Sequence, residues 1–219
     1  MQQRFPGYDV MSQAREWDPV TQAVVQARLG PRPALAFFTP PEEAVARPLM
    51  NRLLELDEGP AVPVLEGIDQ RLATGQLDGY RQVGMPPAPE MWRRSLVALD
   101  EASRERCGRE FALLDRDCQL LVLEGVRTGG DFGGMPGPEV FAAWLRFGCT
   151  ELYSHPDIWN EIGFGGPAYP RGYKATSPGI REPWERADVA PAEDPVPIGA
   201  RMEQARKRHL DGVAARAAK

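Results

Sequence analysis

Hydrophobic residues recur at helical spacing through the middle of the chain. The first such run, residues 39–56, opens with Thr39 followed three residues later by Glu42, the capping-box pattern typical of a helix start. Pro48 lies inside the run and is expected to kink it, because proline removes one backbone hydrogen bond. The apolar face of this predicted helix consists of Val45, Leu49, Leu53 and Leu56.

The same spacing predicts four more helices. One spans residues 63–73, and the proline-free interval 90–135 holds two, the first ending near Gly108 and the second capped by Asp115. A last helix follows the glycine-rich loop 128–137. Their inward-facing residues are, in chain order, Leu65, Ile68 and Leu72; Trp92, Leu96 and Leu99; Cys118, Leu121 and Val122; and Phe141, Trp144, Leu145, Gly148 and Leu152.

No segment alternates apolar and polar residues as a half-buried strand does, so the fold is predicted to be all-α. We expect a small helical bundle with long irregular N- and C-terminal arms rich in proline and glycine. The expected parts are an N-terminal arm with one short helix, a helical core domain, an aromatic and proline-rich arm, and a C-terminal amphipathic helix. They span residues 1–38, 39–155, 156–197 and 198–219.

Composition narrows the classes of function. The 219 residues include 22 prolines, about twice the usual share of ~5%, which favours long irregular segments. A net charge of -5 disfavours nucleic-acid binding, which requires a basic face. The longest aliphatic block, 120–123, is far short of the roughly 18 residues that cross a bilayer. The start of the chain resembles neither a secretory nor a twin-arginine signal, so we expect a soluble, cytoplasmic protein.

Two features that can carry chemistry lack the required context. The glycine-rich loop 128–137 follows a predicted helix rather than a strand and contains no lysine, so it does not match a phosphate-binding loop. Cys107, Cys118 and Cys149 have no C-x-x-C spacing, which indicates neither a disulfide framework nor a zinc site. We expect them to be buried thiols that pack as small hydrophobic groups.

Histidine offers one candidate for acid–base chemistry. The chain has only two histidines, His155 and His209, so a three-histidine metal site is impossible. His155 follows the last core helix, where an imidazole can donate to the final free carbonyls of that helix. We expect this capping role, and a role as acid or base in a stand-alone enzyme is the alternative.

The segment after the core combines aromatic rings with proline and glycine. Such a segment cannot build its own core, whereas aromatic residues and arginine dominate the energetics of protein interfaces. Packing of these rings on the chain's own core is the competing explanation, and docking onto another protein is slightly favoured. The predicted partner-binding residues are Tyr153, His155, Trp159, Phe164, Tyr169, Arg171, Tyr173 and Trp184. No catalytic, cofactor-binding or metal-binding residue is predicted.

These residues also carry a family resemblance. The Thr-Pro-Pro-Glu-Glu start at Thr39, the glycine-rich loop before the Trp144 helix, and the Tyr-Ser-His-Pro block at 153–156 are its first elements. The run from Ile162 to Tyr169, with Gly-Pro-Ala-Tyr at its end, completes the pattern. Together they resemble the gluconate 2-dehydrogenase subunit 3 family over roughly residues 35 to 175.

The resemblance implies an accessory subunit without catalytic residues or a cofactor of its own. Its partner would be a larger FAD-dependent dehydrogenase of the glucose-methanol-choline type that oxidises a sugar or polyol. The chain would stabilise that flavoprotein, help it fold or assist its export. Family members often begin with a twin-arginine signal, which this sequence lacks, so a cytoplasmic complex is expected unless the partner carries a signal to the periplasm. A transient folding factor that leaves after cofactor loading is a further alternative.

Overall fold

The computed structural model describes residues 4–56, 61–174 and 180–189. Within these residues the secondary structure is helical and contains no strand, which confirms the all-α prediction. The nearest approach to β-structure there is an isolated antiparallel bridge between Asp131 and Pro136 in the glycine-rich loop. The C-terminal helix predicted over 198–219 lies outside the described residues.

The chain divides into two compact units, which we treat separately. The helical unit comprises residues 26–158, and the arm unit comprises Met1–Val25 together with Trp159–Lys219. The division falls within two helices, α1 (Pro19–Leu29) and α7 (Pro156–Ile162). The arm unit also contains a 3-10 helix, Val10–Glu16.

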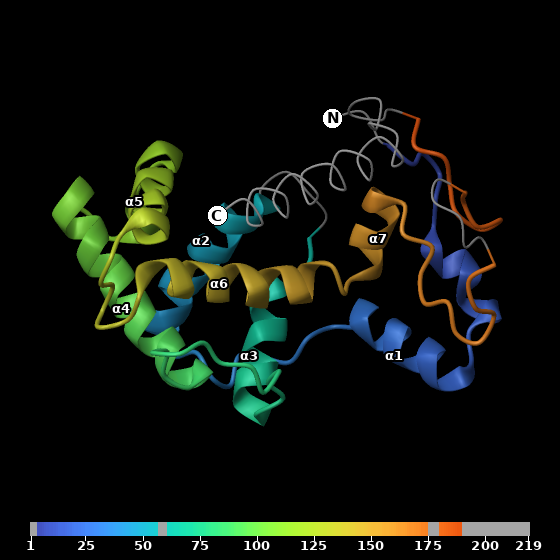
Figure 1. Cartoon of the computed structure of the whole chain (residues 1–219), viewed down its shortest axis with the longest axis horizontal. Helices are drawn as coiled ribbons and strands as arrows, with labels where there is room; N and C mark the ends of the chain where they lie inside the picture. The colour runs from blue at the N-terminus through green and yellow to red at the C-terminus, as the bar shows by residue number, and fades with distance from the viewer. Residues whose placement is uncertain (1–3, 57–60, 175–179, 190–219) are drawn as a thin grey trace, which may run out of the picture. The chain divides into compact units, whose positions relative to one another are not determined.

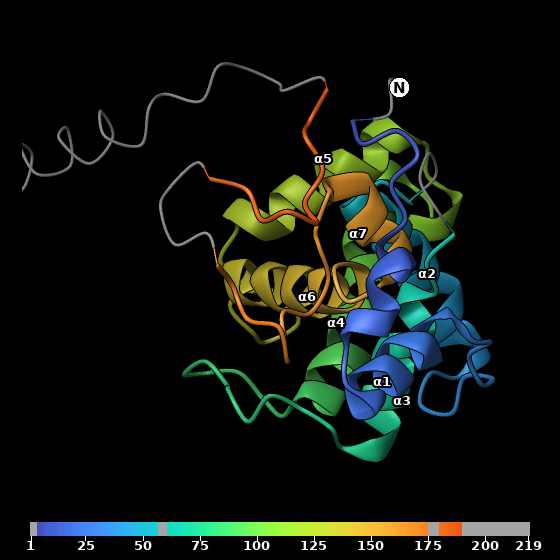
Figure 2. The same cartoon turned by 90° about the vertical axis from the view of Figure 1, so that its right-hand side faces the viewer.

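The helical unit contains the five predicted core helices. They are α2 (Pro40–Leu54), α3 (Val64–Thr74), α4 (Ala88–Cys107), α5 (Arg116–Thr128) and α6 (Gly137–Leu152). α6 packs against α2, α3 and α5, and α5 also contacts α4, so these helices enclose one core (Figure 1, Figure 2). A short 3-10 helix, Phe111–Leu113, connects α4 to α5.

Local hydrogen bonds explain where these helices begin and end. Glu42 accepts the backbone N–H of Thr39 at 2.8 Å, as the predicted capping box requires. The carboxylate of Asp115 accepts the N–H of Cys118 at 2.9 Å and caps α5. Gly108 ends α4 with φ of 74°, a left-handed conformation that glycine adopts without steric cost.

Aromatic rings form the centre of the helical unit. The side chains of Trp92 and Trp144 are completely buried. Trp92 meets the rings of Phe38 and Phe147 edge-on at 5.5 and 5.8 Å, a favourable geometry for aromatic pairs. The indole N–H of Trp144 donates to the hydroxyl of Ser95 at 3.1 Å, which satisfies a polar group that burial removes from water.

The segment leading into α2 is held by one buried carboxylate. Asp69 of α3 is only 3% exposed, and its two oxygens accept the backbone N–H groups of Ala36, Phe37 and Phe38 at 2.7 to 2.9 Å. These three donors precede the first turn of α2 and have no helical carbonyl to bind. Asp69 therefore fixes the entry into the helical bundle.

Candidate partner-binding surface

The segment after α6 is more regular than the sequence analysis predicted. Residues from 156 onward were expected to be irregular, but Pro156–Ile162 forms helix α7. Proline suits the first turn of a helix because its missing N–H is one that no helical carbonyl would accept there. Gly163, with φ of 69°, follows the last helical residue and lets the chain turn away.

Within the arm unit, the N-terminal segment and the C-terminal arm stabilise each other. The hydroxyl of Tyr8 donates to the carbonyl of Phe164 at 3.1 Å, and the backbone N–H of Val10 donates to Asn160 Oδ1 at 2.7 Å. Trp159 is 4% exposed and belongs to a buried cluster. The other buried members of this cluster are Tyr8, Val10, Trp17 and Val25.

Arg171 connects three parts of the arm unit. Its guanidinium carbon lies 3.9 Å from the centre of the Trp184 ring, within the range of a cation–π contact. The same group donates to Gln13 Oε1 and to the carbonyl of Gly165, both at 3.0 Å.

Gly166 adopts φ of 76° beneath Trp17, and an added Cβ would come within 2.7 Å of that ring. The backbone can approach the indole only because this residue is glycine.

The structure divides the predicted partner-binding residues by accessibility. Trp159 and His155 are buried, and Arg171 and Trp184 are partly buried. The remaining four residues are exposed, and they are Tyr153, Phe164, Tyr169 and Tyr173. Tyr169 and Tyr173 are 69% and 61% exposed and stand four positions apart in the arm unit, whereas Tyr153 belongs to the helical unit. Whether these residues contact a partner stays a prediction.

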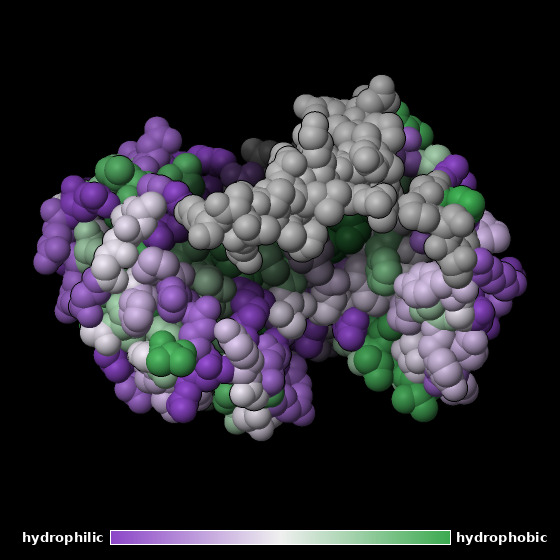
Figure 3. Space-filling view, in the orientation of Figure 1, coloured by the Kyte–Doolittle hydropathy of each residue, from purple (hydrophilic) through white to green (hydrophobic). Residues whose placement is uncertain are grey.

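Several exposed apolar side chains escaped the sequence analysis. In the arm unit they are Val20, Val24, Ile162, Ile180 and Val189, which are about half exposed or more. On the face shown in Figure 3, exposed apolar side chains stand as separate green groups among purple ones. Sequence pattern does not reveal the exposure of Ile180 and Val189, because in an irregular segment no periodicity separates inward from outward positions.

His155 caps the helix that follows it rather than the one that precedes it. Its Nδ1 accepts the backbone N–H of Asp157 at 3.3 Å, so the imidazole satisfies an amide in the first turn of α7. The prediction that it donates to the last carbonyls of α6 was therefore wrong. The ring is 5% exposed, and burial lowers the pKa of His155 below 6.5. The charge of Arg32 adds to this shift in pKa, whereas the charge of Asp157 and the backbone of Arg28 oppose it.

Beside this histidine, several arginines surround one carboxylate. Arg71 Nη1 lies 3.5 Å from Glu151 Oε1, and Arg28 Nη1 donates to the carbonyl of Ser154 at 2.8 Å. Burial raises the pKa of Glu151, although the charges of Arg71, Arg32 and Arg28 oppose the shift. Gly67 of α3 is in direct contact with the Glu151 carboxylate, because an added Cβ there would collide with it. This cluster holds the end of α6 against α3.

The buried histidine predicts a pH-dependent stability. The unfolded imidazole takes up a proton near pH 6.5, whereas the buried ring requires a lower pH, so between these two pKa values the unfolded state binds more protons. Stability is therefore lost as pH falls below 6.5, by at most about 1.4 kcal/mol per pH unit from this group. In His155→Gln this part of the slope should disappear, as urea denaturation from about pH 7.5 to 5.5 would measure. Equal slopes for both proteins would contradict the assignment.

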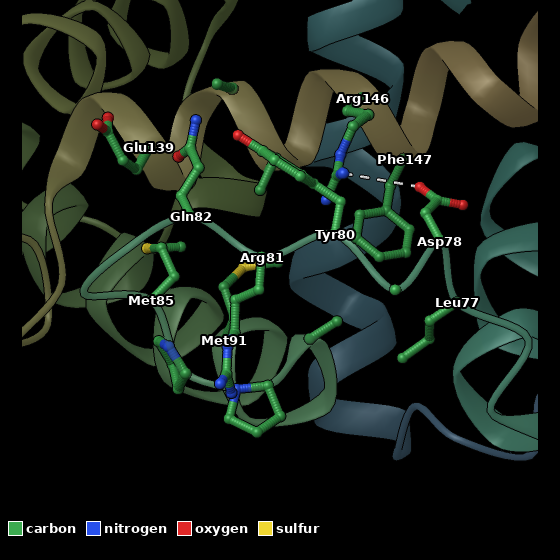
Figure 4. Close-up of a pocket in the computed structure, with 16 residues that line it drawn as sticks. Leu77, Asp78, Tyr80, Arg81, Gln82, Met85, Met91, Glu139, Arg146 and Phe147 are labelled. Atoms are coloured by element: carbon green, nitrogen blue, oxygen red, sulfur yellow. Dashed lines mark ion pairs between the residues drawn. The ribbon is translucent and has the colours of Figure 1, made fainter.

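A pocket of about 550 Å³ lies in the helical unit between α4, α6 and the loop that joins α3 to α4 (Figure 4). Its floor is apolar, with Met85, Met91 and Phe147, while the guanidinium of Arg146 lies 5.2 Å from the ring of Tyr80. Arg146 also pairs with Asp78 at 3.7 Å. The described residues that line the pocket include the carboxylates of Asp78 and Glu139 but neither histidine nor cysteine.

The described part of the chain contains no group of three or more histidine, cysteine, aspartate or glutamate side chains that could hold a metal ion. Across the same residues, no helix combines the length and apolar character needed to cross a membrane. The pocket beside Arg146 and the exposed aromatic residues are two features of the described chain that can bind another molecule.

The fold and these surfaces define a small all-helical protein whose exposed rings suit contact with another chain. A comparison with protein families matches residues 40–166 to the family described as gluconate 2-dehydrogenase subunit 3. The match covers more than half of the sequence, so the chain belongs to this family. Comparisons with curated proteins and with solved structures gave no match. The family's description names a subunit of a dehydrogenase.

Proposed function

We propose that this chain is a non-catalytic small subunit of a flavin-dependent dehydrogenase that oxidises a sugar or polyol. Membership of the gluconate 2-dehydrogenase subunit 3 family carries the proposal, because the family's description names a subunit of a dehydrogenase. FAD belongs to the larger partner, a flavoprotein of the glucose-methanol-choline type. The role of the small subunit is to bind that flavoprotein and stabilise it.

The burial and hydrogen bonding of His155 support an accessory rather than a catalytic role for this chain. A general acid or base must reach the substrate directly or through one water molecule. His155 is 5% exposed, its Nδ1 already accepts a backbone hydrogen bond, and it does not line the pocket of the helical unit. Its environment is that of a helix cap, which argues against the alternative of a stand-alone enzyme built on His155.

The exposed rings of the arm unit support docking through residues 164–173. Tyrosine offers a large apolar area at low entropic cost and is enriched among interface residues that dominate binding energy. Tyr169 and Tyr173 expose most of their surface, while the neighbouring Arg171 is fixed by Trp184, Gln13 and Gly165. The arm therefore presents its rings from an ordered backbone, which lowers the cost of ordering on binding.

Affinity purification from the native cell tests the function. A tagged chain should copurify in constant ratio with one larger polypeptide that carries a flavin spectrum and sugar or polyol dehydrogenase activity. The isolated chain should be colourless and inactive. Binding of FAD and oxidation of a sugar by the isolated chain would overturn the proposal. Copurification with the flavin-free partner alone would instead identify a transient folding factor.

A further inference from the structure

One face of α6 forms a wall of the pocket in the helical unit. It presents Glu139, Ala142, Ala143, Arg146 and Phe147, which are spaced as residues on one face of a helix are. Glu139 and Arg146 stand about two turns apart, or roughly 10 Å along the helix axis. The two alanines between them have short side chains, so the space beside α6 stays open between its two charged ends (Figure 4).

The size and floor of the pocket suit a small organic molecule. Its volume of about 550 Å³ lies within the range of small-molecule sites, roughly 300 to 1,000 Å³. Met85 and Met91 belong to the floor, and methionine side chains adapt to ligands of different shape. One side chain of a partner protein would leave much of this volume empty and the lining atoms without contacts. The expected occupant is therefore a whole small molecule with an apolar body.

Arg146 is held in place while its hydrogen-bond donors remain available. Its guanidinium carbon lies 5.2 Å from the ring centre of Tyr80 and 5.8 Å from that of Phe147. Asp78 Oδ2 lies 3.7 Å from Arg146 Nη1, which is too long for a hydrogen bond. Among the residues that the structure describes, none accepts a hydrogen bond from this guanidinium, and the side chain is 38% exposed. Its planar fork of N–H groups can therefore bind a carboxylate through two parallel hydrogen bonds.

The charges around Arg146 favour an anion at this end of the pocket. Arg71 also donates to Asp78, and Glu151 lies 3.5 Å from the same Arg71. These two carboxylates are outnumbered by the guanidinium groups around them, which belong to Arg28, Arg32, Arg71 and Arg146. Arg81 adds a further cation to the pocket lining. The other carboxylate of the lining, that of Glu139, lies at the far end of the α6 face (Figure 4).

We propose that this pocket binds a small carboxylic acid with an apolar body. The carboxylate accepts hydrogen bonds from Arg146, and the body lies beside Ala142 and Ala143 over the methionine-lined floor. This inference goes beyond the proposed function, because binding requires neither the flavoprotein nor its reaction.

The ligand is held by noncovalent contacts, since no thiol of the described chain lines the pocket. Cys107, Cys118 and Cys149 all lie outside it. The prediction that these three thiols are buried was wrong, because each of them is partly exposed.

Titration of the isolated full chain with octanoate, followed by amide NMR, tests the proposal. Octanoate combines a carboxylate with a flexible apolar body. We expect saturable shifts of the amide signals from residues 77–88 and 139–147, which form the pocket. Octanol has the same body without the charge, so it should bind at least about tenfold more weakly at neutral pH. Equal affinity for the two probes, saturable shifts only outside the pocket, or no saturable shift would overturn the proposal.

Substitutions locate the two parts of the site. Arg146→Gln should weaken octanoate binding by roughly 10- to 100-fold and leave octanol binding near that of the wild type. Arg146→Lys should fall between, because lysine keeps the charge but not the planar fork. Ala142→Leu should weaken the binding of both probes by filling the open space, and Ala142 is exposed, so the fold should tolerate the change.

The matched control is Arg127→Gln, which removes an arginine of α5 that is 53% exposed and does not line the pocket. It should bind octanoate as the wild type does. If Arg146→Gln binds octanoate as tightly as Arg127→Gln does, Arg146 does not bind the carboxylate and the proposal fails. The wild-type comparison of octanoate with octanol needs no variant, so it decides even if a variant folds poorly.

Discussion

Replacing Asp69 by alanine is expected to lower the free energy of unfolding of the helical unit by roughly 3 to 5 kcal/mol. The substitution removes one carboxylate that accepts three backbone N–H groups, those of Ala36, Phe37 and Phe38. The site is buried, so water cannot fully replace the lost acceptor, and each stranded donor adds its own cost. Urea denaturation followed by circular dichroism measures the loss.

Two further variants make this test specific. Asp69→Asn keeps the shape and one accepting oxygen but turns an amide group toward donors, so its loss should be intermediate. Gln70→Ala changes the adjacent, exposed residue of α3 and should stay within about 0.5 kcal/mol of the wild type. If Asp69→Ala unfolds at the same urea concentration as Gln70→Ala, Asp69 does not organise the entry into α2.

Helix positions were predictable because the signals for them are local. Glu42 lies three residues from Thr39, Asp115 caps through an amide three residues on, and Gly108 adopts its left-handed conformation at the end of its own helix. The role of Asp69 was not predictable in the same way. Its donors lie more than 30 residues earlier, and only the packed structure brings them to the carboxylate.

The sequence showed which residue types form the candidate site, but it did not show which of their side chains are exposed. Trp159 and Tyr169 occupy the same aromatic stretch, yet one is 4% and the other 69% exposed. What separates them is the N-terminal segment, whose Trp17 packs into the cluster that buries Trp159. The sequence gives no pairing signal between segments so far apart. For the same reason, the pocket beside Arg146 emerged only from the fold.

Replacing both Tyr169 and Tyr173 by alanine is expected to weaken binding of the flavoprotein by at least about 2 kcal/mol, or roughly 30-fold in the dissociation constant. Both rings are largely exposed, so the free energy of unfolding of the isolated chain should remain within about 0.5 kcal/mol of the wild type.

Trp159→Ala should instead lower the free energy of unfolding by roughly 3 to 5 kcal/mol, because it empties a buried site. Calorimetric titration of the copurifying flavoprotein and urea denaturation give the two measurements.

The comparison between these variants separates docking from folding. Val83→Ala trims a side chain of the helical unit that is 99% exposed and does not line the pocket, and it should leave both affinity and stability near those of the wild type. If the Tyr169/Tyr173 double variant binds the flavoprotein as tightly as Val83→Ala does, the exposed rings of the arm unit are not the docking surface. The family assignment would stand in that case, because it rests on residues 40–166 rather than on these side chains. The contact would then have to be sought on the helical unit, where Leu113, Leu120 and Leu121 are also exposed.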